Sequence, residues 1–327
     1  MDSEALVQLA LNTLSCQQKE LAARLDVSST QISKWKKGEH MSQEMEDKLR
    51  AITQISDRDA RFVLWCGSIE TAVKWERLLH YLAGLASDSD ETGYITEPLN
   101  DDLGLLCWST FYTLKEMGVD IPKEFPEELE IIPHRDDDWE LDDDDAWEFD
   151  IDENPYSSLI YAIYKSLTDV YGFYAAYVSD LIFDDDLDLY STPAENIEPC
   201  LMLLAASKVD VEEKFAKNIR KFRRQTIRDY EEWLTIVKNS AFRAGIPLRA
   251  ELLDLVYGSH DEVGHEAEAE SLGFNASRIH PDVYMNELLV GMRIIHQVLP
   301  AILKKLGIEE EFQLDTSQLR VDSTPRQ

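Results

Sequence analysis

The sequence predicts an all-α protein, and three observations support this fold class. Apolar residues recur at spacings of three and four in almost every long segment, which is the period of an amphipathic helix. We find no internal repeat and no alternation of strands with helices that would predict a βαβ unit. Hydrophobic residues make up 44% of the 327 residues, an ordinary fraction for a folded chain.

Two short helices with a sharp turn between them are predicted near the amino terminus. Ser15 can cap the first helix, and Gln18 three residues later completes a capping box. One face of this helix carries apolar or small residues, namely Leu21, Ala22 and Leu25. Asp26 stands where the chain must turn, close to a left-handed conformation that Asp tolerates better than most residues.

The second helix begins after Ser28, again with a glutamine three residues later, Gln31. Two of its residues are expected to point back into the core, Ile32 and Trp35. Gly38 is expected to end it. A further helix over 42–52 follows, with glutamates in its first turn, where negative charge is favourable.

This segment closely resembles the Cro/C1-type (XRE-like) family of DNA-binding domains. The resemblance rests on QKELA (Gln18–Ala22) and VSSTQISKW (Val27–Trp35), and it covers roughly residues 3–55. The family usually has glycine at the turn position that Asp26 occupies. Many members also have Ser or Thr where this chain has Gln17.

The resemblance implies a helix-turn-helix domain over 1–57, whose second helix enters the major groove and uses its first residues on base edges. The residues expected to read bases are Ser29, Thr30 and Gln31, with Lys34 behind them. Gln18 would contact a phosphate or brace these readers. Lys36 and Lys37 would bind backbone phosphates, which positions the domain without specifying a sequence. The alternative is a small helical domain that uses this scaffold only for protein contacts.

The charge distribution opposes non-specific DNA binding. The chain has 32 basic and 64 acidic residues, a net charge of −32. Residues 1–57 hold seven Lys or Arg and nine Asp or Glu, a net −2, so the other −30 belongs to residues 58–327. An acidic surface repels the phosphate backbone, although charges more than about 8 Å away are mostly screened at cellular ionic strength. We therefore expect either a dimer that presents only its amino-terminal domains to double-stranded DNA, or a local basic patch that holds the operator.

Residues 136–153 form the most acidic segment, with 12 acidic residues among 18. The large aromatic side chains within it are Trp139, Trp147 and Phe149. Dense runs of like charge usually remain solvated and mobile, so we expect a disordered loop at about 133–154. The functional alternatives are a strip that docks on a basic protein partner, a DNA mimic, and an internal competitor for the amino-terminal domain.

Residues 58–309 are expected to form a large acidic domain of helices, followed by a polar tail over 310–327. The predicted helices cover 62–85, 101–117, 155–183, 194–207, 210–244, 248–273 and 281–305. A polar loop, with room for a short strand, is expected over 87–97. One face of the last helix is apolar and consists of Met285, Leu288, Met292, Ile295, Leu299 and Ile302.

A basic stripe lies opposite the apolar face of the predicted helix 210–244. It consists of Lys217, Arg220, Lys221, Arg224 and Arg228, with Arg223 beside them. Such a stripe is usually a solvated or salt-bridged face. The alternatives are a second phosphate-binding surface and a seat for the acidic segment. In the latter case Arg220 and Arg224 would join the three aromatic side chains as partner-binding residues.

Enzyme chemistry is not expected. In HDEVGH the histidines His260 and His265 are five apart and Glu262 does not directly follow the first, so this is not an HExxH zinc motif. The four cysteines form no CxxC pair, which favours reduced thiols; they are Cys16, Cys66, Cys107 and Cys200. No phosphate-binding glycine loop or nucleophile motif is found in the sequence. We expect no catalytic residue, no cofactor and no metal.

The amino terminus MDSEAL lacks the basic and apolar regions of a signal peptide. No apolar run approaches the roughly 18 residues of a membrane span, so we expect a soluble, cytoplasmic protein. The resemblance implies a homodimeric, sequence-specific transcriptional regulator of prokaryotic or phage-like type, acting as a repressor. Its helical domain would oligomerise and sense a partner or ligand. The alternative is an antitoxin or anti-defence protein whose acidic domain binds a basic partner, with the amino-terminal domain serving autoregulation.

Overall fold

The computed structural model describes residues 3–130 and 151–307. Within these ranges the chain is all-helical, and the β pairing is limited to an isolated antiparallel bridge between Val119 and Ala216. The predicted all-α fold class is therefore confirmed. Of the helices in the described ranges, none combines the length and apolarity that crossing a membrane requires.

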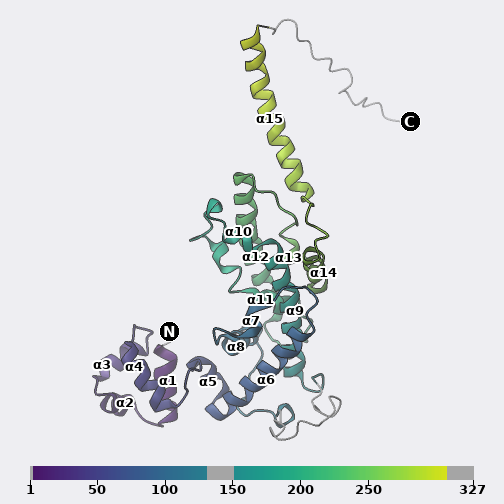
Figure 1. The fold of residues 1–327 in the computed structure, drawn as a ribbon. Coiled ribbons are helices and arrows are strands. Elements are labelled where there is room, and N and C mark those ends of the chain that lie inside the picture. The colour runs from purple at the N-terminus through teal and green to yellow at the C-terminus, as the bar shows by residue number, and fades with distance from the viewer. Residues whose placement is uncertain (1–2, 131–150, 308–327) are drawn as a thin grey trace.

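Four helices lie together at one end of the molecule (Figure 1): α1 (Ser3–Thr13), α2 (Gln18–Leu25), α3 (Ser29–Trp35) and α4 (Gln43–Thr53). The central group consists of α5 (Ala60–Cys66), α6 (Ile69–Asp88), α7 (Glu97–Asn100), α8 (Leu106–Glu116), α9 (Pro155–Tyr177), α10 (Ser179–Ile182), α11 (Leu201–Lys208), α12 (Ile219–Ala244), α13 (Asp254–Tyr257) and α14 (His260–Ser271). Its 3-10 turns are η1 (Glu127–Leu129), η3 (Asp185–Leu187) and η4 (Pro193–Asn196). The last helix, α15 (Pro281–Leu306), projects from the far end of the central group.

Two of the predicted long helices are interrupted at glycines. The predicted helix 62–85 is two helices, α5 and α6, because Gly67 between them takes a φ of +86°. The predicted helix 248–273 is reduced to α13 and α14, with Gly258 between them. A Cβ at Gly258 would lie 2.9 Å from the Asp254 carbonyl oxygen, so the sharp break requires glycine.

The predicted helix 210–244 begins late, at Ile219. The residues before it pair with the chain that leaves α8: the Asn218 N–H donates to the Met117 carbonyl at 2.9 Å. This close approach depends on Gly118, because a Cβ there would lie 2.6 Å from the Asn218 nitrogen. Tertiary pairing thus replaces the first turns of the helix. No strand forms in 87–97, whose first residues continue α6 to Asp88.

The core of the central group is organised around α9. This helix is rich in aromatic residues and most of its residues are buried, Tyr164 and Tyr174 almost completely. A helix of this kind must be covered by other elements, and α6, α11 and α14 pack against it. Large aromatic side chains therefore fill the space between helices, where each buries a large apolar area.

The buried tyrosines of the core keep hydrogen-bond partners for their hydroxyl groups. The Tyr164 hydroxyl lies 2.7 Å from the Thr110 hydroxyl, and Tyr230 donates to the Ile197 carbonyl at 2.6 Å. Burial raises the pKa of both phenols well above the ordinary value. Both side chains therefore remain neutral donors or acceptors that join neighbouring helices, since an unpaired hydroxyl at these depths would be costly.

The amino-terminal helices are joined to the central group by direct packing. α1 packs against α3 and α4 and also against α5, so apolar residues of both groups belong to one continuous cluster. Arg50 of α4 donates to the carbonyl oxygens of Ser56 and Arg58 at 2.9 and 3.0 Å. Arg58 in turn pairs with Glu76 of α6 at 2.6 Å. These contacts fix the connection between α4 and α5 on both sides.

We predict that Gly264→Ala destabilises the fold by about 1–3 kcal/mol, because overpacking forces a buried contact apart. Gly264 lies on α14 where it faces α9, and an added Cβ would lie 2.1 Å from the Asp169 carboxylate oxygen. Gly84→Ala in α6 is the matched control: its Cβ would meet nothing within 4 Å, so it should stabilise by up to about 1 kcal/mol. Urea unfolding of both variants measures the difference, and equal stabilities would contradict the close approach.

Candidate functional site

The turn between α2 and α3 has the predicted local geometry. Asp26 ends α2 in the left-handed region, with φ 56° and ψ 44°. Ser28 caps α3, and its hydroxyl oxygen accepts a hydrogen bond from the Gln31 N–H at 3.1 Å. The predictions for Asp26 and Ser28 are confirmed. A connection of three residues joins Leu25, the end of α2, to Ser29, the start of α3.

The start of α2 differs from the prediction. The N-cap is Gln17, and the Glu20 carboxylate accepts from the Gln17 N–H at 2.9 Å. Ser15, the predicted cap, takes a φ of +46° and belongs to the turn after α1. Gln17 and Glu20, three residues apart, form the capping box at the start of α2. The predicted box of Ser15 with Gln18 does not form.

α3 has one buried and one exposed side. Ile32 and Trp35 are 0% and 4% exposed, as predicted, and anchor the helix in the core. The end of α3 is also tied to α1, because the Ser3 hydroxyl lies 3.1 Å from the Trp35 carbonyl oxygen. The side chains of Ser29, Thr30 and Lys34 are exposed on the other side. This short helix thus exposes two small hydroxyl side chains and a lysine, while its buried side holds it in place.

Gln18 connects α2 to α3. Its Nε2 group donates to the Ser29 carbonyl at 2.8 Å and to the Ser33 hydroxyl. The amide is half-buried, and its hydrogen bonds restrain the first turn of α3. Of the two roles expected for Gln18, the bracing role is the one these contacts provide.

The remaining basic side chains lie at the end of α3. Lys36 and Lys37 are exposed. Lys34 lies 3.6 Å from the Glu39 carboxylate, with both side chains about half exposed. An exposed pair of this kind contributes little to stability, so Lys34 can leave Glu39 for an anionic ligand. Gln31 is half-buried, and its backbone serves the cap of α3.

Of the predicted partner-binding residues, Arg220 and Arg224 lie in the part of the chain that the structure describes. Arg220 of α12 forms an ion pair with Glu213, and Arg224 is exposed. Arg223 points inward and donates to the Ser207 carbonyl at 3.0 Å, which caps the end of α11. The acidic segment lies largely outside the described residues, as do its three aromatic side chains Trp139, Trp147 and Phe149 and the polar tail.

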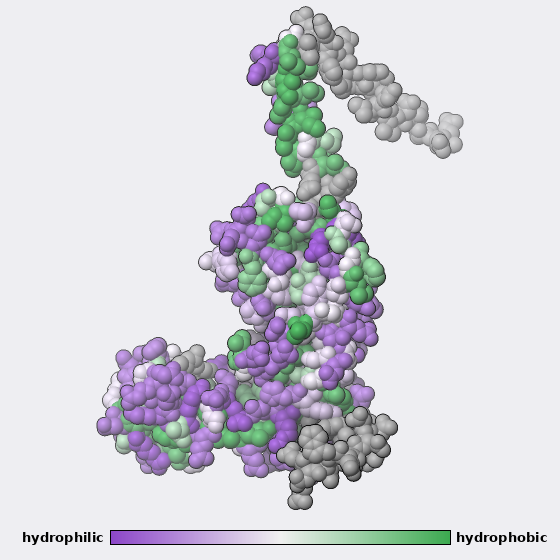
Figure 2. All heavy atoms as spheres, in the orientation of Figure 1, coloured by the Kyte–Doolittle hydropathy of each residue, from purple (hydrophilic) through white to green (hydrophobic). Residues whose placement is uncertain are grey.

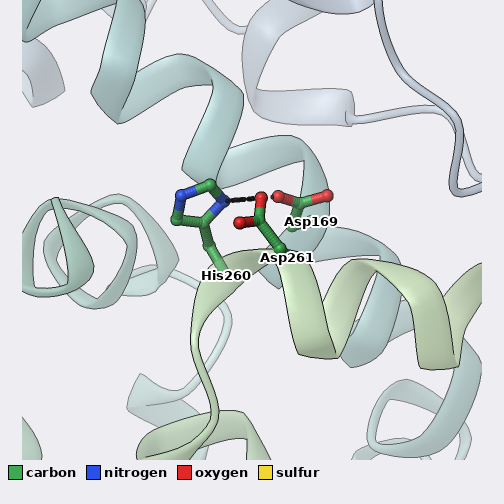
Figure 3. Close-up of side chains that lie close together, drawn as sticks. All are labelled: Asp169, His260 and Asp261. Atoms are coloured by element: carbon green, nitrogen blue, oxygen red, sulfur yellow. Dashed lines mark hydrogen bonds and ion pairs between the residues drawn. The ribbon is translucent and has the colours of Figure 1, made fainter.

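A second group of polar side chains joins α9 to α14 (Figure 3). It comprises Asp169, His260 and Asp261, whose ligand atoms all lie within 4.8 Å of one another. His260 Nδ1 lies 2.7 Å from an Asp169 carboxylate oxygen and 3.1 Å from one of Asp261. His260 stands in a motif that can be recognised in the sequence, whereas Asp169 lies 91 positions away in no local motif and cannot be found from the sequence.

This group is both an ion pair and a set of possible metal ligands. The hydrogen bond to Asp169 raises the pKa of His260 above its ordinary value of 6.5, which favours the charged imidazolium. A cavity of about 170 Å³ lies beside it, lined in part by Lys165, His265 and Glu268. One imidazole and two carboxylates are suitable ligands for a divalent metal. The contact between His260 and Asp169 already satisfies both side chains as a link between two helices.

Comparison of the chain with protein-family models, with curated proteins and with solved structures gives no match. Function is therefore inferred from the residues and their geometry.

We predict that His260→Gln costs more stability near pH 6 than near pH 9, by roughly 0.5–1 kcal/mol. The pKa of His260 is raised in the folded state. Its stabilising contribution is therefore fully present below the unfolded pKa of about 6.5 and is lost as pH rises through the folded pKa. Urea unfolding at the two pH values measures this, with Asp169→Asn as the matched background. Asp261 also raises the pKa of His260, so a smaller pH effect should remain in that background; an effect of undiminished size would contradict the assigned ion pair with Asp169.

Proposed function

We propose that this protein is a sequence-specific DNA-binding transcriptional regulator that acts as a repressor by occluding its site. In this proposal α2 and α3 form a helix-turn-helix, and α3 enters the major groove. The observation that carries the proposal is the two-sided character of α3, with Ile32 and Trp35 buried and Ser29 and Thr30 exposed. Base edges are read by short polar side chains held in a fixed register.

The dimensions and bracing of α3 support this role. Seven residues span about 10 Å, a length that fits across a major groove about 12 Å wide. Gln18 holds the first turn through the Ser29 carbonyl at 2.8 Å, which restrains the backbone of the proposed readers. Restraint before binding lowers the entropy that is lost when a specific contact forms.

Electrostatics supports phosphate contacts at the end of the same helix. Lys34, Lys36 and Lys37 lie within four residues of one another, in a segment whose net charge is near zero. The rest of the chain is strongly acidic and would repel DNA. Binding would therefore be confined to the amino-terminal helices, and a pair of them would bind half-sites about one helical turn apart. For a regulator of the prokaryotic type that the resemblance implies, action on DNA would place the protein in the cytoplasm.

We predict that DNA selection with the purified full chain yields a near-palindromic site, and that Thr30→Ala changes the preferred bases within it. Loss of one good base contact should cost about 1–3 kcal/mol at one position of each half-site. Lys48→Ala on α4, an exposed lysine that pairs with Glu44, is the control and should leave the preference unchanged. Absence of any enriched site with a folded protein would reject the regulator and favour a protein partner.

We also predict that Lys36→Ala/Lys37→Ala weakens binding to all sequences alike. Each lost phosphate contact should reduce the slope of log affinity against log salt by about 1, so the double variant should lose about 2. Fluorescence anisotropy on specific and random duplexes over a salt series measures the slope. An unchanged slope would show that these lysines do not contact phosphates.

A further inference from the structure

α15 is the most exposed apolar element among the described residues. Figure 1 shows it projecting away from the other helices, and Figure 2 shows hydrophobic residues along its length. The chain before it is fixed to the central group, where the His280 N–H donates to the Leu248 carbonyl at 2.7 Å. A helix with so much exposed apolar surface needs a partner in water.

The apolar residues of α15 follow a strict heptad spacing. Seven of them alternate at spacings of three and four, and we call these the seam: Met285, Leu288, Met292, Ile295, Leu299, Ile302 and Leu306. Each is between 37 and 64% exposed. The mean spacing is 3.5 residues, whereas a straight helix has 3.6 residues per turn. Over three heptads the seam therefore drifts by about 60° around a straight helix. A strict 3.5 repeat is the pattern of a helix that packs on another helix.

We propose that α15 is the assembly element of this protein and packs its seam against α15 of a second copy. The positions off the seam fit this arrangement. Arg293, Gln297 and Lys304 are exposed on the side away from it. Pro300, which cannot donate a backbone hydrogen bond, also lies off the seam.

The available area suits pairing with a second copy. Burying a side chain of this size removes roughly 60–120 Å² of apolar surface from water. The partly exposed seams of two copies, with flanking residues such as Leu289 and Val298, together offer on the order of 1,000 Å², near the lower limit for a stable interface. A helix standing away from the central group can bring its whole length into such a contact.

The residues of the seam favour more than two helices. The first position of each heptad is Met or Leu, while the fourth is Ile in two heptads, at Ile295 and Ile302. Leu at the first and Ile at the fourth position, the combination found at Leu299 and Ile302, shift the preference from dimers towards trimers and tetramers. Apolar residues that flank the seam widen it, which also favours bundles of more than two helices. We therefore expect a tetramer, which would hold its four amino-terminal segments as two pairs.

Sedimentation equilibrium of the full chain without DNA tests the proposal. The wild type should have a multiple of the 37.6 kDa chain mass, and Ile295→Glu should reduce it to that of the monomer. Gln297→Glu is the matched control, because it adds the same charge two residues away and off the seam. Far-UV circular dichroism checks that both variants stay folded. Since no DNA is present, failure of this proposal is distinct from failure of DNA binding.

Three results would overturn the proposal. They are a monomeric wild type, an oligomer that Ile295→Glu leaves intact, and a monomer that floats with vesicles containing phosphatidylglycerol. The last would make α15 a helix for a lipid surface, where an amphipathic helix buries its apolar face. A dimer that Ile295→Glu dissociates would support the seam and overturn the tetramer.

Discussion

The burial of α9 is the constraint on which the central group of helices depends. A helix with most of its residues buried requires neighbours around most of its circumference, and α6, α11 and α14 pack against it. α6 and α14 then need only one apolar face, so their outer faces are free to carry charge, whereas α11 is itself buried on nearly every side. This division explains how a chain with a net charge of −32 maintains one continuous core.

α3 shows the opposite arrangement, because its few buried side chains hold the helix so that its other side chains face the solvent. Ile32 and Trp35 hold a short helix in place, while Gln18 restrains its first turn from outside. The exposed groups between them are small and chemically versatile, and their positions are set before any ligand arrives. α15 differs from both helices, because the side chains that it exposes are apolar. Their burial would require another molecule.

Local patterns in the sequence were sufficient for most helices and for the α2–α3 turn. Asp26, Ser28, Ile32 and Trp35 behave as predicted because capping and amphipathic spacing act within a few residues. The errors at Gly67, Gly258 and residues 210–218 have a different origin. Residues 210–218 are set by pairing with a distant segment, and Gly67 and Gly258 are local breaks in the backbone that glycine allows; neither cause leaves a periodic signal. The contact of His260 with Asp169 is missed for the same reason, since it joins residues 91 positions apart.

The packing of α1 on α5 has a mechanical consequence. Domains joined by a flexible linker reorient freely, whereas this joint is formed by a continuous apolar cluster and by the ion pair of Arg58 with Glu76. A rotation of α6 would therefore pull on Arg58, just before α5, and move α1 together with α5. The amino-terminal helices would therefore move together with the central group. In an assembly, the distance between the amino-terminal helices of two copies would then be set by how their central groups are held.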